Sequence, residues 1–193
     1  MKKILVSIVL VFCLSAVTSC FTADTTAVVE AKEKKKKKIA YEMTWKSFKK
    51  KWKKEAKSYE LDNISKIKNY EVRKTNSGPA KYGIIKEDLY VGLNTNTDAG
   101  GDFGAVSVSG RITPDIKNSD KNVMNACALL IMMADPTISF EKRKKIAFDK
   151  LKLDKRYDAP ITFEYSYKGV KYTAEHKIHS NGIGTMFVTV KEE

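Results

Sequence analysis

Residues 161–191 read ITFEYSYKGVKYTAEHKIHSNGIGTMFVTVK, and this stretch determines the fold class of the chain. It contains three runs rich in β-branched and aromatic residues, at 161–167, 170–179 and 183–191. The residue pairs between these runs are typical of tight hairpin turns: Lys168-Gly169 and Asn181-Gly182. We therefore predict a meander of three antiparallel strands over this stretch.

The side-chain period of two assigns the residues of these strands to faces. The aromatic side chains of the first strand share one face: Phe163, Tyr165 and Tyr167. In the second strand, His176 and His179 point to opposite faces, which argues against joint ligation of a metal. We expect both histidines to be ordinary surface or hairpin residues.

Two more strands are predicted at 82–93 and 103–112, paired antiparallel, while residues 64–73 fit either the end of a helix or a strand. The polar loop between the pair carries oxygen side chains at alternate positions, as calcium loops do: Asn94, Asn96, Asp98 and Asp102. Ala99 and Ala105 stand where such a loop needs glycine and a bidentate glutamate, so we predict no metal site. The loop is interpreted as a mobile hairpin tip, with partner recognition as the alternative.

Two helices are predicted between this strand pair and the meander. The first spans 120–134 with Ser119 as its cap, and it should be the central core helix with Cys127 buried in it. The second spans 140–153 with Ser139 as its cap. Four of its residues should face inward: Phe140, Ile146, Ala147 and Leu151. Its outer side is basic and is either a solvated face or a binding patch: Lys142, Arg143, Lys144 and Lys145.

A third helix is predicted from its cap Thr44 to about Ser58. Its apolar stripe recurs at spacings of three and four: Trp45, Phe48, Trp52 and Ala56. We expect this stripe to pack on the sheet of the domain. The alternative is a helix in a membrane interface, with its aromatic residues at the headgroups and its lysines around them.

Together these elements predict an α+β fold, formed by a single domain over residues 40–193. It consists of an antiparallel sheet of about five strands, two central helices and an N-terminal amphipathic helix. No nucleophile paired with a base and no glycine-rich phosphate loop is visible in the sequence. Glu87 and Asp88 should point to opposite sides of a strand, so they offer no acid/base pair. We predict no enzymatic activity, no catalytic residue and no cofactor.

The net charge of +13 is concentrated in one segment of the chain. Between Lys32 and Lys57 there are 13 lysines against three glutamates, whereas residues 58–193 carry only about +3. The basicity is therefore a local property and not a property of the domain. We expect no nucleic-acid partner.

The first twenty residues indicate export. Lys2 and Lys3 precede an apolar run from Ile4 to Val17, which at about 14 residues is too short to span a bilayer and fits the core of a secretory signal. The run closes with Val17-Thr18-Ser19-Cys20, which resembles the lipobox of bacterial lipoproteins. The resemblance implies that residues 1–19 are a signal peptide and that Cys20 carries a diacylglyceryl thioether. The alternative is an ordinary cleaved signal with a chance cysteine.

Residues 20–39 are predicted to form a flexible lysine-rich tether. An acyl anchor and a polybasic segment together hold a membrane better than either alone, because lysines attract anionic headgroups. The tether can therefore contact anionic lipid or an anionic wall polymer through its uninterrupted basic run: Lys34, Lys35, Lys36, Lys37 and Lys38. The other interpretation is a solvated spacer.

The lipobox resemblance implies a protein of the bacterial cell envelope that is anchored to the membrane through Cys20. From the residues we expect a binding or interaction module, and its ligand stays open. One alternative is an inhibitor or immunity lipoprotein whose protein partner is an enzyme or toxin. Another is a hydrolase that acts on wall material.

Overall fold

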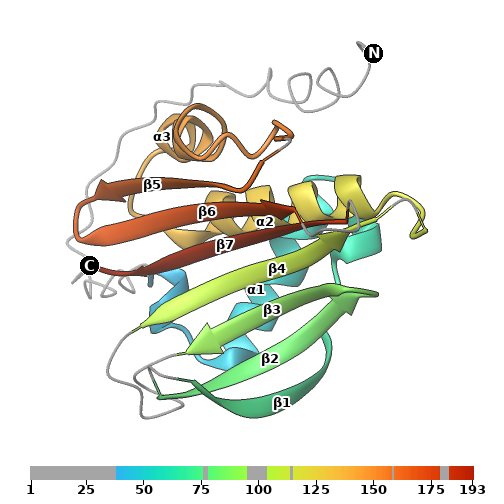
Figure 1. The fold of residues 1–193 in the computed structure, drawn as a ribbon. Coiled ribbons are helices and arrows are strands. Elements are labelled where there is room, and N and C mark those ends of the chain that lie inside the picture. Colours follow the sequence, from blue (N-terminus) through green and yellow to red (C-terminus); the bar gives the residue numbers. More distant parts are fainter. Residues whose placement is uncertain (1–37, 76–77, 95–103, 114, 158, 179–182) are drawn as a thin grey trace, which may run out of the picture. The chain divides into compact units, whose positions relative to one another are not determined.

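A computed structural model of the chain describes residues 38–75, 78–94, 104–113, 115–157, 159–178 and 183–193. Within these ranges, seven antiparallel strands form one sheet in the order β1-β2-β3-β4-β7-β6-β5 (Figure 1). The strands are β1 (Lys68–Thr75), β2 (Gly78–Lys86), β3 (Leu89–Asn94), β4 (Ala105–Ile112), β5 (Ile161–Tyr167), β6 (Val170–Ile178) and β7 (Gly184–Glu192).

The predicted C-terminal meander is confirmed as β5, β6 and β7. Each of these strands pairs antiparallel with the next. Lys168 and Gly169 connect β5 to β6 with φ angles of 53° and 73°, the left-handed conformation that a tight hairpin turn needs at both positions. Strand β7 then pairs with β4, and this pairing joins the two halves of the sheet.

The single strand predicted over 82–93 is a hairpin. Strand β2 ends at Lys86 and β3 begins at Leu89, with Glu87 and Asp88 in the turn. Asp88 has a φ of 53°, and aspartate tolerates this left-handed conformation because its short polar side chain can bond locally. Glu87 and Asp88 therefore do not lie on opposite sides of a strand. With β1 formed from the ambiguous stretch, the sheet has seven strands rather than about five.

Helix α1 (Trp45–Ser58) places its apolar stripe in the core. Thr44 caps it as predicted, because Thr44 Oγ1 accepts a hydrogen bond from the Ser47 backbone N at 3.3 Å. Trp52 Nε1 donates to the Ile64 carbonyl oxygen at 2.8 Å. All four residues of the stripe are buried: Trp45, Phe48, Trp52 and Ala56. The alternative of a helix in a membrane interface is wrong, because this stripe is not accessible to lipid.

Helix α2 (Ser119–Ala134) is the predicted core helix. It packs on β4 and β7 and beside α1, and both helices lie behind the sheet in Figure 1. Cys127 is fully buried, as predicted. The helix approaches β4 closely at Gly110, where an added Cβ would lie 2.4 Å from Val123 Cγ2. The absence of a side chain at this position therefore sets the distance between helix and sheet.

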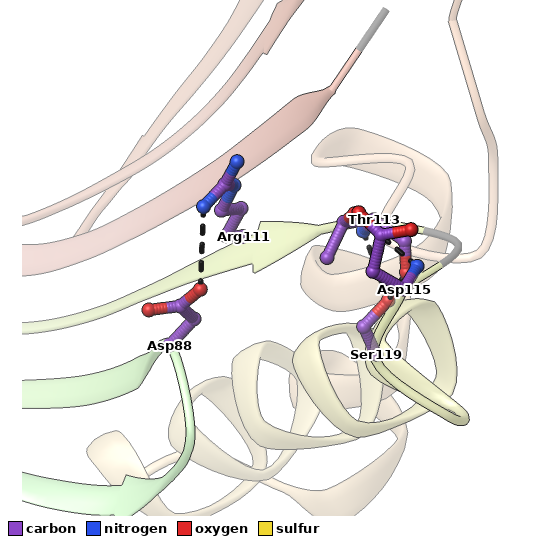
Figure 2. Close-up of polar contacts among 5 residues, drawn as sticks. All are labelled: Asp88, Arg111, Thr113, Asp115 and Ser119. Atoms are coloured by element: carbon purple, nitrogen blue, oxygen red, sulfur yellow. Dashed lines mark hydrogen bonds and ion pairs between the residues drawn. The ribbon is translucent and has the colours of Figure 1, made fainter.

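Hydrogen bonds fix the connection from β4 to α2 (Figure 2). Ser119 Oγ donates to the Thr113 carbonyl oxygen at 2.6 Å and accepts from the Thr113 backbone N at 3.0 Å. The Ser119 hydroxyl is thus used by Thr113, and the prediction that Ser119 caps the helix is wrong; the cap residue is Asn118, with a φ of 60°. Arg111 and Asp88 form an ion pair at 3.6 Å that ties the β2–β3 turn to β4.

The second predicted helix changes type along its length. It consists of α3 (Phe140–Lys145), which is α-helical, and η4 (Ile146–Lys150), which is π-helical. Three of its four predicted inward residues are buried: Ile146, Ala147 and Leu151. The fourth, Phe140, is 41% exposed. Phe140 is the first residue of α3, whereas the three buried residues lie in or directly after η4, whose π turn holds more residues than an α turn and changes the period of the pattern.

The face of the sheet opposite α1 and α2 exposes a row of apolar side chains. Ile84 pairs with Tyr90, and Tyr90 and Phe187 both pair with Ser109. Each of the three apolar residues is at least 36% exposed. Two pairs of charged side chains on this face form ion pairs, Lys171–Glu164 at 2.9 Å and Lys177–Glu175 at 2.6 Å.

Several predicted features lie outside the described residues. They are the signal peptide, Cys20, the loop at 95–103, His179 and most of the tether, including Lys34, Lys35, Lys36 and Lys37. Lys38 is described and exposed. Among the helices of the described ranges, none combines the length and the apolar character that a membrane span needs.

Candidate anion-binding site

Strand β5 and the segment α3–η4 bring aromatic and basic side chains together at one edge of the sheet. Strand β5 is the outermost strand on this side, and η4 packs beside it (Figure 1). Tyr165 and Tyr167 lie two residues apart and share one face of β5. Their rings stack with centroids 6.4 Å apart and an interplanar angle of 12°. The two half-buried rings form a platform that faces α3.

Lys142 lies over this platform. Its Nζ donates a hydrogen bond to Tyr165 Oη at 2.6 Å. The same Nζ is 5.0 Å from the centroid of the Tyr165 ring and 4.3 Å from that of Tyr167. The negative faces of aromatic rings attract a cation at such distances. The ammonium is therefore held by two rings and a hydroxyl.

Two further lysines flank Lys142. Lys150 Nζ lies 5.6 Å from the Tyr165 ring centroid, and Lys168 Nζ lies 5.5 Å from that of Tyr167. Among the described residues, none of the three ammoniums forms an ion pair with a carboxylate. We call these five residues the tyrosine–lysine cluster: Lys142, Lys150, Tyr165, Tyr167 and Lys168. The cluster therefore gathers three ammoniums that no carboxylate of the described residues meets at ion-pair distance, although Glu193 lies nearby and bonds Ser166 and the Gly169 carbonyl oxygen.

A buried polar layer adjoins the cluster. Tyr172 pairs with Tyr165 across β5 and β6, is 1% exposed, and its hydroxyl has no hydrogen-bond partner among the described residues. Burial is the main cause of the raised pKa of Tyr172, and the negative charge of Asp135 adds to it. Asp135 is itself buried and accepts hydrogen bonds from the Thr137 N and Oγ1 at 2.8 Å and 2.6 Å. This layer supports the cluster from below but is closed to solvent.

Removing the hydroxyl of Tyr172 should not destabilise the fold. In Tyr172→Phe the desolvation cost of an unpaired buried hydroxyl is relieved, so we expect the free energy of unfolding to stay equal or to rise by up to about 1 kcal/mol. The matched change Tyr165→Phe removes the acceptor of the Lys142 hydrogen bond and should lower it by about 0.5–1.5 kcal/mol. Urea unfolding of both variants measures the difference in sign. A loss for Tyr172→Phe that equals that of Tyr165→Phe would contradict this account.

His176 is buried, contrary to the prediction of a surface or hairpin residue. It is 6% exposed and lies on the inward face of β6 with Tyr172 and Ala174. The Tyr157 ring covers it, with centroids 5.0 Å apart in a T-shaped arrangement, and Phe163 contacts it at 6.2 Å. His176 Nε2 has no partner within the described ranges. Burial lowers the pKa of His176, because the charged form loses its hydration.

The lowered pKa predicts that acid weakens the fold. The unfolded chain takes up a proton on His176 as the pH falls through about 6.5, whereas the folded chain does so only at lower pH. The free energy of unfolding should therefore fall between about pH 7.5 and 5.5, before carboxylates titrate. Urea unfolding at both pH values should show this fall in the wild type and in His179→Gln, and a smaller fall in His176→Phe. An equal fall in all three proteins would mean that a group other than His176 causes the loss of stability in acid.

Other features of the described chain fit a site less well. A depression of about 410 Å³ between η3 (Asp62–Ile64) and β2 is lined by both signs of charge, including Lys66 and Glu87. Burial raises the pKa of the Cys127 thiol, so its nucleophilic thiolate does not form at neutral pH. Within the described ranges, no three His, Cys, Asp or Glu side chains group as metal ligands would.

The sequence predicts the tyrosine pair of β5 and the basic side of the second helix, but it does not predict that the two lie in contact. It places Tyr165 and Tyr167 on one strand face and makes the outer side of the second helix basic, including Lys142. The structure brings these two features together and adds Lys150 and Lys168. The fixed spacing of Tyr-x-Tyr followed by the Lys168-Gly169 turn is a usable signal for the β5 side alone.

Comparisons with protein-family models, with curated proteins and with solved structures found no match to this chain.

Proposed function

We propose that the chain is an exported bacterial lipoprotein, anchored to the cell membrane through Cys20, and that its domain is a binding module for an anionic partner. The anchor rests on the lipobox-like Val17-Thr18-Ser19-Cys20 that follows an apolar signal. The binding role rests on one observation: Lys142 is held against two tyrosine rings and is not paired with a carboxylate of the described residues.

Preorganisation of Lys142 favours this role over that of a solvated charge. A mobile lysine loses about 0.5–1.5 kcal/mol of side-chain freedom when a ligand immobilises it. Lys142 is half-buried and already ordered by Tyr165 and Tyr167, so most of this cost does not arise on binding. The charge is both available and positioned, which is what recognition of an anion needs.

The tether and the cluster have different tasks in this proposal. The basic run next to the anchor reinforces membrane attachment at anionic headgroups or wall polymer, with Lys34, Lys35, Lys36, Lys37 and Lys38. The tyrosine–lysine cluster belongs to the folded domain and contacts the ligand. Membrane attachment and ligand binding can therefore be separated by mutation.

A second candidate function is an inhibitor or immunity lipoprotein that intercepts a protein. The exposed row of Ile84, Tyr90 and Phe187 on the open face of the sheet favours it, because large apolar side chains in a group are typical of protein interfaces. A complex through this row should resist salt. Binding through the cluster should weaken with salt, because screening acts on exposed charges.

Full-length protein in nanodiscs of neutral lipid tests the proposal with two polyanions, polyphosphate and polyglutamate. We expect at least one to bind, and Lys142→Gln/Lys150→Gln/Lys168→Gln to lose at least tenfold in affinity at about 50 mM salt. The matched variant Lys35→Gln/Lys36→Gln/Lys37→Gln removes the same charge from the tether and should lose much less. Equal losses in both variants would mean non-specific attraction, and an intact mass without diacylglyceryl on Cys20 would contradict the anchor.

A further inference from the structure

We propose that the exposed side of helix α1 lies on an anionic membrane surface and turns the open face of the sheet away from the bilayer. The contact is electrostatic and leaves the buried apolar stripe of α1 inside the fold. This inference rests on the proposed membrane anchor at Cys20 and adds the surface of the domain that meets the membrane. Three features support it: the arrangement of the α1 lysines, their charge balance, and the length of chain that joins them to Cys20.

Six lysines line one side of α1. They follow the helical spacing i, i+3, i+4, i+7, i+8 and i+11, which places them side by side along about 17 Å of the helix. Five of them are exposed, and Lys49 is half-buried with its Nζ 5.8 Å from the centroid of the Trp45 ring. Glu55, the one acidic residue of Trp45–Ser58, falls outside this spacing. We call the six residues the lysine face: Lys46, Lys49, Lys50, Lys53, Lys54 and Lys57.

The charge of the lysine face is not balanced within the described part of the chain. None of its six ammoniums forms an ion pair with a carboxylate of the described residues. The tyrosine–lysine cluster has only three such ammoniums. The open face of the sheet differs in carrying two pairs of opposite charges: Lys171–Glu164 and Lys177–Glu175. An anionic surface therefore attracts the exposed side of α1 more strongly than the open face.

The lysine face is unfavourable for the helix itself. Like charges at spacings of three and four repel each other and destabilise a helix, and seven lysine pairs of the face have these spacings. The first turn carries Lys46 and no acidic residue, although the helix dipole favours negative charge there. Folding alone does not account for this arrangement. A negatively charged headgroup layer offsets the repulsion, because it attracts each of the lysines.

The chain between Cys20 and the domain keeps an anchored bilayer within reach. Lys38 follows Cys20 by 18 residues, so the two cannot lie more than about 65 Å apart. Helix α1 begins seven residues later, at Trp45. A soluble anion has to be recruited from solution, whereas the bilayer stays at this distance, and weak attraction of each lysine then suffices to orient the domain. The length of chain therefore favours the membrane as the polyanion that the lysine face meets.

Lysine acetylation of the full-length protein in nanodiscs, read by mass spectrometry, tests the contact. Discs of neutral lipid are compared with discs that contain anionic lipid. We expect the lysine face to react at least about fivefold more slowly on anionic discs at low salt. This protection should vanish at about 0.5 M salt, because salt screens exposed charges. Lys177 on the open face is 59% exposed and should react equally on both kinds of disc.

A variant with four fewer charges separates membrane contact from folding. The remaining Lys49 and Lys54 should lose their protection on anionic discs when the other four lysines are replaced, in Lys46→Gln/Lys50→Gln/Lys53→Gln/Lys57→Gln. The melting temperature of this variant should equal or exceed that of the wild type, because repulsion along α1 is reduced. A matched variant removes the same charge from the tether and should keep most of the protection: Lys34→Gln/Lys35→Gln/Lys36→Gln/Lys37→Gln.

Four other outcomes would overturn the inference. Equal protection of Lys177 would mean that the lysine face does not orient the domain. Protection of Lys142, Lys150 and Lys168 in place of the lysine face would make the tyrosine–lysine cluster the membrane contact. Protection by soluble polyphosphate on neutral discs, but not by anionic lipid, would assign the lysine face to a soluble polyanion. Equal acetylation on both kinds of disc would mean that α1 does not meet the membrane.

The same samples test the anchor separately. A lipid anchor at Cys20 holds the protein on neutral discs, where the lysine face has no anionic lipid to meet. Loss of the protein from neutral discs would therefore contradict the proposed anchor, whatever the acetylation shows. Retention on neutral discs together with equal acetylation would leave the anchor in place and contradict only the contact of α1.

Discussion

Trp52→Ala should lower the free energy of unfolding by about 3–5 kcal/mol, the usual range for truncation of a large buried aromatic side chain. Trp52 is fully buried on the inward side of α1. Its ring lies 6.0 Å from that of Phe48, centroid to centroid, and its Nε1 bonds the Ile64 carbonyl oxygen at 2.8 Å. Truncation would leave a cavity. It would also remove the hydrogen bond to the Ile64 carbonyl oxygen, which accepts from no other side chain of the described residues.

Two controls separate packing from other effects at this position. Trp52→Phe keeps much of the apolar volume but loses the hydrogen bond, so its cost should be clearly smaller. Lys53→Ala changes the adjacent exposed residue of α1 and should stay within about 0.5 kcal/mol of the wild type. Urea unfolding followed by circular dichroism measures all three. If Trp52→Ala left unfolding unchanged and reduced binding to vesicles, the stripe would be a membrane contact after all.

The helices α1 and α2 could be predicted from the sequence because their signals are local. Thr44 before Trp45 and the apolar spacing of three and four fix α1, and both features depend only on neighbours along the chain. The continuous apolar character of 120–134 likewise indicates a helix that is covered on most sides. The cap residue of α2 could not be predicted from local signals, because the Ser119 hydroxyl bonds the backbone of Thr113 in the preceding turn.

The hairpin turn at Glu87-Asp88 could not be predicted from the sequence, because it contains neither the glycine nor the asparagine that is typical of such turns. Lys86, Glu87 and Asp88 are the only charged residues between Tyr82 and Leu93, and the β-branched and aromatic content around them predicts one strand over the whole run. Asp88 adopts the left-handed conformation in this turn, and its carbonyl oxygen accepts a hydrogen bond from the Arg111 backbone N of β4 at 2.9 Å. The periodicity of apolar residues contains neither feature, so it does not give the number of strands here.

The candidate site was only partly predictable for the same reason. Alternation along β5 gives the shared face of Tyr165 and Tyr167, and helical spacing gives the basic side that includes Lys142. Their contact requires α3 to lie over the edge of the sheet, and the π-helical η4 changes which residues follow on that side. His176 is a similar case, since its burial depends on Tyr157, which comes from a different part of the chain.

Gly110→Ala should lower the free energy of unfolding by about 1–3 kcal/mol, the range for overpacking a tight contact. The new Cβ would lie 2.4 Å from Val123 Cγ2 and 2.9 Å from Leu89 Cδ1, so either α2 or β4 has to move. A valine cannot yield by rotating a long flexible side chain, and this makes the clash costly. The matched change Gly184→Ala in β7 meets only ordinary contacts, the nearest at 3.7 Å, and should be nearly neutral.

A double-mutant cycle with Val123→Ala identifies the source of this cost. Val123→Ala alone should destabilise the fold because it leaves a cavity beneath α2. In Gly110→Ala/Val123→Ala the added methyl group fills part of that cavity, so the double variant should be less destabilised than the sum of the single variants by about 0.5–3 kcal/mol. Urea unfolding of the three variants measures this coupling. Additive losses would mean that the added methyl group does not meet Val123, and that the approach of α2 to the sheet is set at another contact.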